Sequence, residues 1–159
     1  MKKLFYLLVV VGLICFFGCG KTVPDNPACT NRTPIQDSSL LLKFAATDSM
    51  HATMDSSGLF YQIIDSGSSV KPVYTSSITV TYIGKLMSGT IFDSASNTNL
   101  KGAQLYNLIP GWQIGLPKIG VGGHIKLLIP SAYGWGCTGY GPGPPNAPVY
   151  FDVKLLAVN

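Results

Sequence analysis

An alternation of apolar and polar residues with a period of two recurs through the C-terminal part of the chain and constrains its fold most strongly. The segment "GHIKLLIP" shows it: one face of the predicted strand carries Ile125, Leu127 and Ile129, and the other carries His124, Lys126 and Leu128. A strand with one apolar face is typical of an antiparallel sheet that packs one side against a core and leaves the other wet.

Further segments share this pattern and are also predicted as strands, at residues 59–64, 78–86, 89–94 and 149–156. Among them stands a single helix-like segment, Pro110–Gly120. Pro110 suits a first helical turn, and Pro117 limits the helix to about two turns. The sequence therefore predicts an α+β fold, in which a curved antiparallel β-sheet wraps around one short α-helix.

The N-terminus resembles a bacterial export signal. Lys2 and Lys3 precede an apolar run, Leu4–Gly18, which is shorter than the about 20 residues that span a bilayer. Gly18 before Cys19 resembles a lipobox, in which the cysteine is lipidated and becomes the mature N-terminus. A plain signal peptide cut nearby and an uncleaved anchor are the alternatives.

We therefore expect three parts: a lipoprotein signal peptide at 1–18, a lipidated tether with a short helix at 19–57, and a folded domain at 58–159. The tether is polar and contains prolines up to about Gln36. Asp37 and Ser38 are expected to cap the short helix, which would pack through Leu40, Leu41 and Phe44.

The charge pattern argues against binding of nucleic acid or a membrane surface, and the pattern of metal-ligating residues argues against a metal site. The chain carries 11 Lys and Arg against 7 Asp and Glu, two of the lysines lie in the signal, and the rest are scattered. No basic patch of the kind that binds nucleic acid or a membrane surface is present in the sequence. His51 and His124 are isolated, so the sequence predicts no metal site.

Two cysteines remain beyond the signal, Cys29 in the tether and Cys137 in a glycine- and proline-rich loop. An exported protein meets an oxidising compartment, where paired cysteines form disulfides. A Cys29–Cys137 disulfide would fasten the tether to the folded domain. Two free thiols are the alternative.

Four segments in order carry a resemblance to a known family: "VTYIGKLMSGTIFDS", "LIPGWQIGL", "GGHIKLLIPSAYGWG" and "PPNAPVYFDVKLL". From Gly58 to Val158 the chain resembles the FKBP family of peptidyl-prolyl cis–trans isomerases. The signal and tether resemble those of lipid-anchored, exported members from bacteria of the Bacteroidetes type. The resemblance implies the same curved sheet around one helix, and an activity that needs no cofactor.

The resemblance also implies an apolar pocket for a substrate proline. Trp112, in "PGW", would form its floor, and the rings of Tyr82, Phe92 and Phe151 would form its walls. Taken singly, each of these aromatic residues is equally compatible with a place in the core.

Roles are implied for four further positions. Leu108 and Ile109 would form an edge, with the Ile109 N–H holding a substrate carbonyl, and the Tyr133 hydroxyl would donate to another carbonyl. Asp93 would lie close to the twisting amide. An aspartate after an aromatic residue also caps local N–H groups in turns, which is the alternative for Asp93.

The chain departs from the family at two places. Where the family has a phenylalanine before "LIPGW", this chain offers Ala103 or Leu105. In the loop after Tyr133, Pro142 and Gly143 stand where the family has bulky aliphatic residues, and Tyr140 either replaces that cover or faces solvent. The resemblance implies macrolide ligands, and this altered loop is expected to weaken their binding.

The sequence thus indicates an isomerase that acts on proline-containing polypeptides and assists the folding of exported or envelope proteins. It would be anchored by lipid in the cell envelope, facing the periplasm or the cell surface. The first alternative is a peptide-binding chaperone with an FKBP fold and weak or no isomerase activity. The second is a structural envelope lipoprotein.

Overall fold

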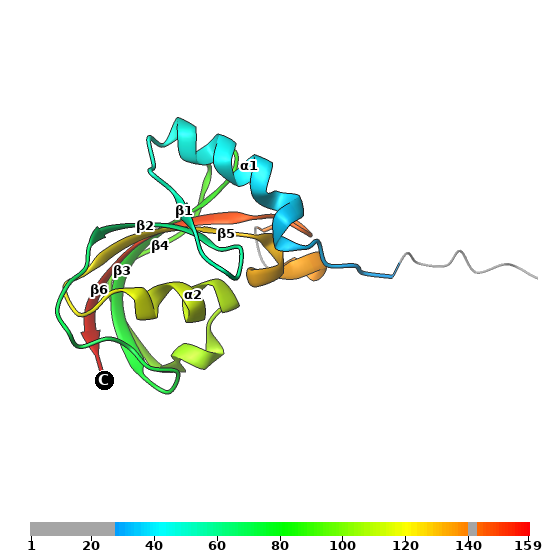
Figure 1. The fold of residues 1–159 in the computed structure, drawn as a ribbon. Coiled ribbons are helices and arrows are strands. Elements are labelled where there is room, and N and C mark those ends of the chain that lie inside the picture. Colours follow the sequence, from blue (N-terminus) through cyan, green and yellow to red (C-terminus); the bar gives the residue numbers. More distant parts are fainter. Residues whose placement is uncertain (1–27, 140–142) are drawn as a thin grey trace, which may run out of the picture.

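The computed structural model describes residues 28–139 and 143–159, with the backbone alone for residues 97–103. Figure 1 shows the fold. The predicted export signal, the predicted lipidation site at Cys19, and Tyr140 and Pro142 of the loop lie outside the described residues.

Six antiparallel strands form one sheet with the order β1-β2-β5-β6-β3-β4. The strands are β1 (Thr53–Met54), β2 (Phe60–Asp65), β3 (Ser77–Leu86), β4 (Ile91–Gln104), β5 (His124–Ile129) and β6 (Val149–Val158). The sheet curves around the short helix α2 (Pro110–Gly115), as Figure 1 shows. The predicted fold class is therefore confirmed. Sequence reasoning missed β1, and it ended β4 too early.

The concave face of the sheet holds the main core. The alternating apolar residues of β5 and β6 contribute Ile125, Leu127, Ile129, Val149, Phe151, Val153 and Leu155 to one cluster with α2. Two glycines let α2 lie directly on β5. A Cβ atom added at Gly111 would come within 2.4 Å of Ile129, and one at Gly115 within 2.6 Å of Leu127.

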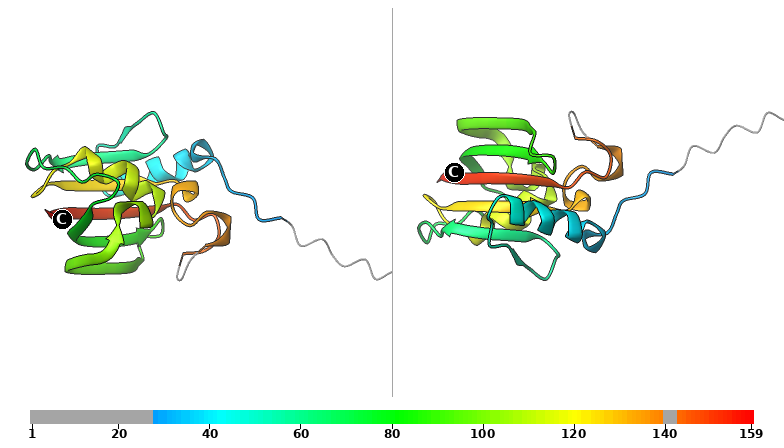
Figure 2. Two further views of the ribbon diagram at one scale, coloured as in Figure 1. Left: turned by 90° about the horizontal axis from the view of Figure 1, so that it is seen from below. Right: turned by 90° about the horizontal axis from the view of Figure 1, so that it is seen from above.

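The convex face is covered by the N-terminal helix α1 (Pro34–Thr47), which lies across the sheet on the side opposite α2 (Figures 1 and 2). A second apolar cluster forms there from Leu41, Phe44, Ala45, Met50, Phe60, Leu128 and Tyr150. The expectation of a wet face was therefore wrong for Leu128 and Tyr150. Leu40, expected to pack, is 40% exposed. Both α1 and β1 precede residue 58, where we placed the domain boundary.

Helix α1 begins earlier than expected, because Thr33 and Pro34 start it. Pro34 occupies the first helical position, where a missing N–H costs nothing. The Thr33 N–H donates to Oε1 of Gln36 at 2.7 Å. The predicted capping role of Asp37 was wrong, since this residue lies inside the helix and is fully buried.

Asp37 instead joins α1 to the loop that follows β5. One of its oxygens accepts hydrogen bonds from the Ser131 N–H at 2.8 Å and the Ser131 hydroxyl at 2.6 Å. Its other oxygen lies 3.2 Å from Nη1 of Arg32, outside hydrogen-bond geometry. A buried carboxylate needs such partners, so Asp37 holds the start of the loop in place.

A disulfide joins Cys29 to Cys137, as predicted, across 108 residues of sequence. Within the described ranges, no helix is long and apolar enough to cross a bilayer. Among the same residues, no three metal-ligating side chains lie close enough together to hold a metal ion.

We predict that Asp37→Ala lowers the free energy of unfolding by about 2–3 kcal/mol, because two buried donors of Ser131 lose their acceptor. Urea denaturation followed by tryptophan fluorescence measures this change. Ser39→Ala, on the exposed side of the same helix, should shift the stability by less than about 0.5 kcal/mol. Equal midpoints for Asp37→Ala and the wild type would contradict the prediction.

Candidate active site

A cavity of about 150 Å³ opens between α2 and the sheet. Its lining consists of Tyr82, Asp93, Leu108, Ile109, Trp112, Trp135 and Phe151. The structure thus brings together most of the residues that the sequence singled out, from β3, β4, β6 and the start of α2. It adds Trp135, and it leaves Phe92 and Tyr133 outside the lining.

Trp112 forms the floor of the cavity and is 5% exposed. Its ring meets Tyr82 edge to face, with centroids 5.2 Å apart, and meets Phe151 in the same way at 5.2 Å. Edge-to-face pairs of this kind stabilise by about 0.5–1.5 kcal/mol beyond the area that they bury. The three rings, held by a helix and two neighbouring strands, therefore fix one another.

Phe92 lies behind the wall and supports it. Its ring packs edge to face against Phe151 and Trp135, each with centroids 5.5 Å apart. Gly84 of β3 leaves room for this packing, since a Cβ there would come within 2.8 Å of Phe151 and 2.9 Å of Phe92. Phe92 thus links the strand wall of the cavity to the loop wall.

The polar edge of the cavity is a hydrogen-bonded pair. The Tyr82 hydroxyl donates to Oδ2 of Asp93 at 2.8 Å. Burial, and then the hydrogen bond to Asp93 and its negative charge, raise the pKa of Tyr82 to about 12. Tyr82 is therefore a neutral donor at physiological pH. Asp93 lies in β4, so its position at the cavity rim differs from that of a turn cap.

Leu108 and Ile109 form the edge that leads into α2. The side-chain amide of Gln113 donates to the Leu108 carbonyl at 2.7 Å and to the Tyr106 carbonyl at 3.0 Å, which holds this segment against the helix. Ile109 is the residue before the first helical position, where backbone N–H groups have no partner within the helix. The placement suits the expected contact with a substrate carbonyl.

Tyr133 lies elsewhere. Its hydroxyl donates to the Ser57 carbonyl at 2.8 Å, and its ring borders a separate hollow beside the start of α1. The bond joins the loop after β5 to the turn before β2. For Tyr133 to donate to a substrate carbonyl, as the resemblance implies, this bond would have to break.

Sequence reasoning missed Trp135. It stands two residues after Tyr133 in an irregular loop, where no periodicity marks which side chains face a site. The available signal was its type, since it is one of only two tryptophans in the chain. Trp135 lines the cavity from the loop in which the resemblance implies that the family's aliphatic residues are missing. Leu105, considered for another wall, is buried in the main core.

A family model described as FKBP-type peptidyl-prolyl cis-trans isomerase matches residues 68–156. FKBP-type peptidyl-prolyl cis-trans isomerase FkpA of Escherichia coli K12 is 39% identical over 107 residues, which are 65% of this chain and 38% of that protein. Outer membrane protein MIP of Legionella longbeachae is 37% identical over 105 residues, 64% of this chain and 45% of that protein.

The chain therefore spans less than half of the length of these two curated relatives. The crystal structure of FkpA from Escherichia coli superposes with a TM-score of 0.66 and 34% identity, covering 80% of this chain and 59% of that one. The fold agrees with that structure, and the family model matches more than half of the chain. The chain belongs to the FKBP-type peptidyl-prolyl cis-trans isomerase family.

Proposed function

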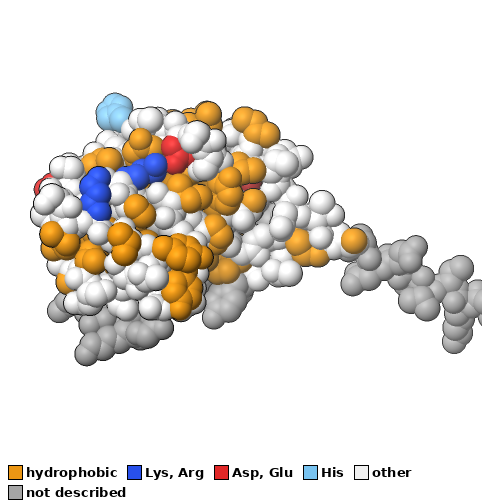
Figure 3. Space-filling model, turned by 60° about the horizontal axis from the view of Figure 1, so that its bottom comes forward, with side chains coloured by type: hydrophobic (Ala, Val, Ile, Leu, Met, Phe, Trp, Pro, Cys, Tyr) orange, Lys and Arg blue, Asp and Glu red, His pale blue; other side chains and the backbone are white. Residues whose placement is uncertain are grey.

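We propose that this protein catalyses the cis–trans isomerisation of Xaa–Pro peptide bonds and assists the folding of exported or envelope proteins. The observation that carries the proposal is the small aromatic cavity floored by Trp112, with Asp93 as its charged group. We assign the activity to the predicted domain at 58–159. Figure 3 shows many apolar and few charged side chains on the side of the molecule where α2 lies, which suits contact with unfolded polypeptides.

The reaction requires a shaped apolar site rather than a nucleophile. Rotation about the amide C–N bond meets a barrier of roughly 18–20 kcal/mol, and Xaa–Pro bonds exchange over tens to hundreds of seconds unaided. The twisted amide has lost resonance and is less polar than the planar one. A cavity walled by rings favours that less polar state, which is selective stabilisation of the transition state.

Five of the lining residues have direct roles in the proposed reaction. Trp112, Phe151 and Tyr82 hold the proline ring, and the Ile109 N–H fixes a substrate carbonyl so that rotation occurs about one bond. Asp93, held by the Tyr82 hydroxyl, places a fixed charge beside the twisting amide. We also infer that macrolide ligands bind weakly, because Gly143 stands where the family has a bulky aliphatic residue.

Loss of the floor should abolish most of the activity. We predict that Trp112→Ala lowers kcat/KM for a Xaa–Pro peptide at least about tenfold, as expected for truncation of a buried aromatic anchor. A protease-coupled or NMR exchange assay measures it. The matched variant Trp112→Phe keeps a ring but removes the buried indole N–H, for which the described residues offer no acceptor. It should retain more activity than Trp112→Ala. Wild-type rates in Trp112→Ala would refute the assignment.

The polar edge gives a second prediction. Tyr82→Phe removes the donor to Asp93 and keeps the ring, and kcat/KM should fall about threefold or more, since hydrogen bonds to charged groups are the stronger ones. The raised pKa of Tyr82 means that the folded hydroxyl stays neutral until pH rises through about 12, and that the stability it contributes is full below pH 10 and is lost between pH 10 and about 12. The difference between wild-type and Tyr82→Phe ultraviolet titrations should therefore develop near pH 12. A difference that develops near pH 10 would contradict it.

We propose further that the protein is anchored in the cell envelope by lipid on Cys19. Support comes from the lipobox-like "GC" and from a relative named outer membrane protein MIP. Cys19→Ala should move the protein from the membrane fraction to the soluble fraction, because several acyl chains are needed for firm binding. Cys15→Ala is the matched control and should stay with membranes. Membrane retention of Cys19→Ala would exclude this anchor.

A further inference from the structure

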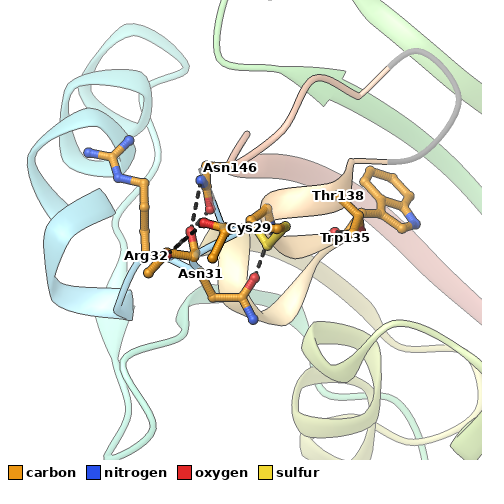
Figure 4. The surroundings of a disulfide bond; sticks show 9 residues. Cys29, Asn31, Arg32, Trp135, Thr138 and Asn146 are labelled. Carbon is orange, nitrogen blue, oxygen red and sulfur yellow. Dashed lines mark hydrogen bonds between the residues drawn. A yellow bond between two sulfur atoms is a disulfide. The ribbon is translucent and has the colours of Figure 1, made fainter. Parts of the chain in front are cut away.

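An exposed segment of the chain is fastened across the loop that carries Trp135. This strap, residues 28–33, is exposed at every position and runs from the N-terminal end of the described chain into α1. Figure 4 shows it lying against two parts of the loop, residues 135–138 and Asn146. The loop begins after Ile129, where β5 ends, and reaches β6 at Val149.

The strap holds the first part of the loop through two contacts to one residue. Cys29 forms the disulfide with Cys137, and the Cys137 N–H donates to Oδ1 of Asn31 at 2.8 Å. Gly136, between Trp135 and Cys137, has φ +57, and a Cβ added there would come within 2.4 Å of the same Asn31 oxygen. The backbone next to Trp135 is therefore shaped by close contact with the strap.

Asn146 ties the second part of the loop to both the strap and the first part. Its side-chain oxygen accepts from the Arg32 N–H at 3.2 Å, and its side-chain amide donates to the Thr30 carbonyl at 3.2 Å. Its own N–H donates to the Gly136 carbonyl at 2.8 Å. Together with Asp37 and Ser131 at the start of the loop, these contacts fix the described parts of the loop at three points.

Without the disulfide these contacts are weak. Hydrogen bonds at exposed positions open readily, and chain segments near a terminus fray unless they are tied down. The covalent link keeps Asn31 and Arg32 beside their partners at high effective concentration. The disulfide therefore determines whether the other strap contacts form.

We propose that the Cys29–Cys137 disulfide and Asn31 are positioning residues for Trp135, and that they thereby set the affinity of the proline cavity for its substrate. The inference rests on the proposed isomerase function. Trp135 lines the cavity from the loop after β5, and its ring packs edge to face against Phe92 of the sheet. Its place beside the cavity depends on Gly136 and Cys137, which the strap holds.

The first test is kinetic. Cys29→Ser leaves the loop sequence intact. It should raise KM for a Xaa–Pro peptide about three- to tenfold, because loss of one aromatic contact weakens binding by about that factor. The value of kcat should change less than about twofold. Wild type treated with dithiothreitol, which donates two electrons and two protons to give two thiols, should behave in the same way. Thr30→Ala, which keeps the backbone contact of the strap, should match the oxidised wild type.

A second variant shows whether the effect passes through Trp135. In Trp135→Ala, reduction of the disulfide should raise KM no further, because coupled residues give non-additive effects. An additional rise of the same size as in the wild type would show that the disulfide acts on the cavity by another route. A fall in kcat with KM unchanged would also overturn the inference.

The third measurement does not depend on catalysis, so it separates failure of this inference from failure of the proposed function. Trp112→Phe leaves Trp135 as the only tryptophan, and reduction should then red-shift its fluorescence and increase its quenching by acrylamide. Cys29→Ser in the same background should show the reduced spectrum before dithiothreitol is added. Equal spectra and quenching in the oxidised and reduced states would refute the positioning role, whether or not the protein is an isomerase.

Discussion

The close approach of α2 to β5 is the constraint on which the rest of the structure depends. Gly111 and Gly115 lie one helical turn apart and remove the side chains that would keep the helix away from Ile129 and Leu127. A helix of this length is unstable by itself in water, so its position comes from this packing. The contact sets how deep Trp112 lies in the concave face, and Tyr82 and Phe151 pack against Trp112 from the neighbouring strands β3 and β6.

The two faces of the sheet carry different parts of the structure. The concave face holds the aromatic floor, while α1 on the convex face covers Leu128 and Tyr150 and carries Asp37 to the loop after β5. A single helix thus completes the core and anchors one end of the loop beside the cavity. The strap that precedes α1 anchors the same loop further along through Cys137. The N-terminal region is therefore part of the architecture around the site.

How far the sequence predicts the structure depends on how far apart along the chain the interacting residues lie. The strands of the core were predictable, because alternation is a local signal, whereas the aromatic floor was implied by the resemblance that the four motifs carry together. The disulfide was predictable from compartment and cysteine count. Trp135, the Tyr133–Ser57 bond and the burial of Asp37 were not, since each depends on segments distant in the chain that meet only in the folded state. No periodicity in an irregular loop marks a wall of a cavity.

The walls of the cavity differ in how firmly they are held, and this difference bears on how each affects the reaction. Trp112, Tyr82 and Phe151 are fixed by helix and sheet. Under the proposed function they therefore present the same surface to the planar and the twisted amide and favour the less polar one. Trp135 is held by a loop and stands over the cavity from one side. Under the proposed function, a wall of this kind contacts the bound polypeptide equally while its amide is planar and while it is twisted. Such a contact lowers KM without changing kcat. In the proposed reaction, selective stabilisation is thus assigned to the rigid floor, and affinity for the polypeptide is assigned to the loop that the disulfide holds.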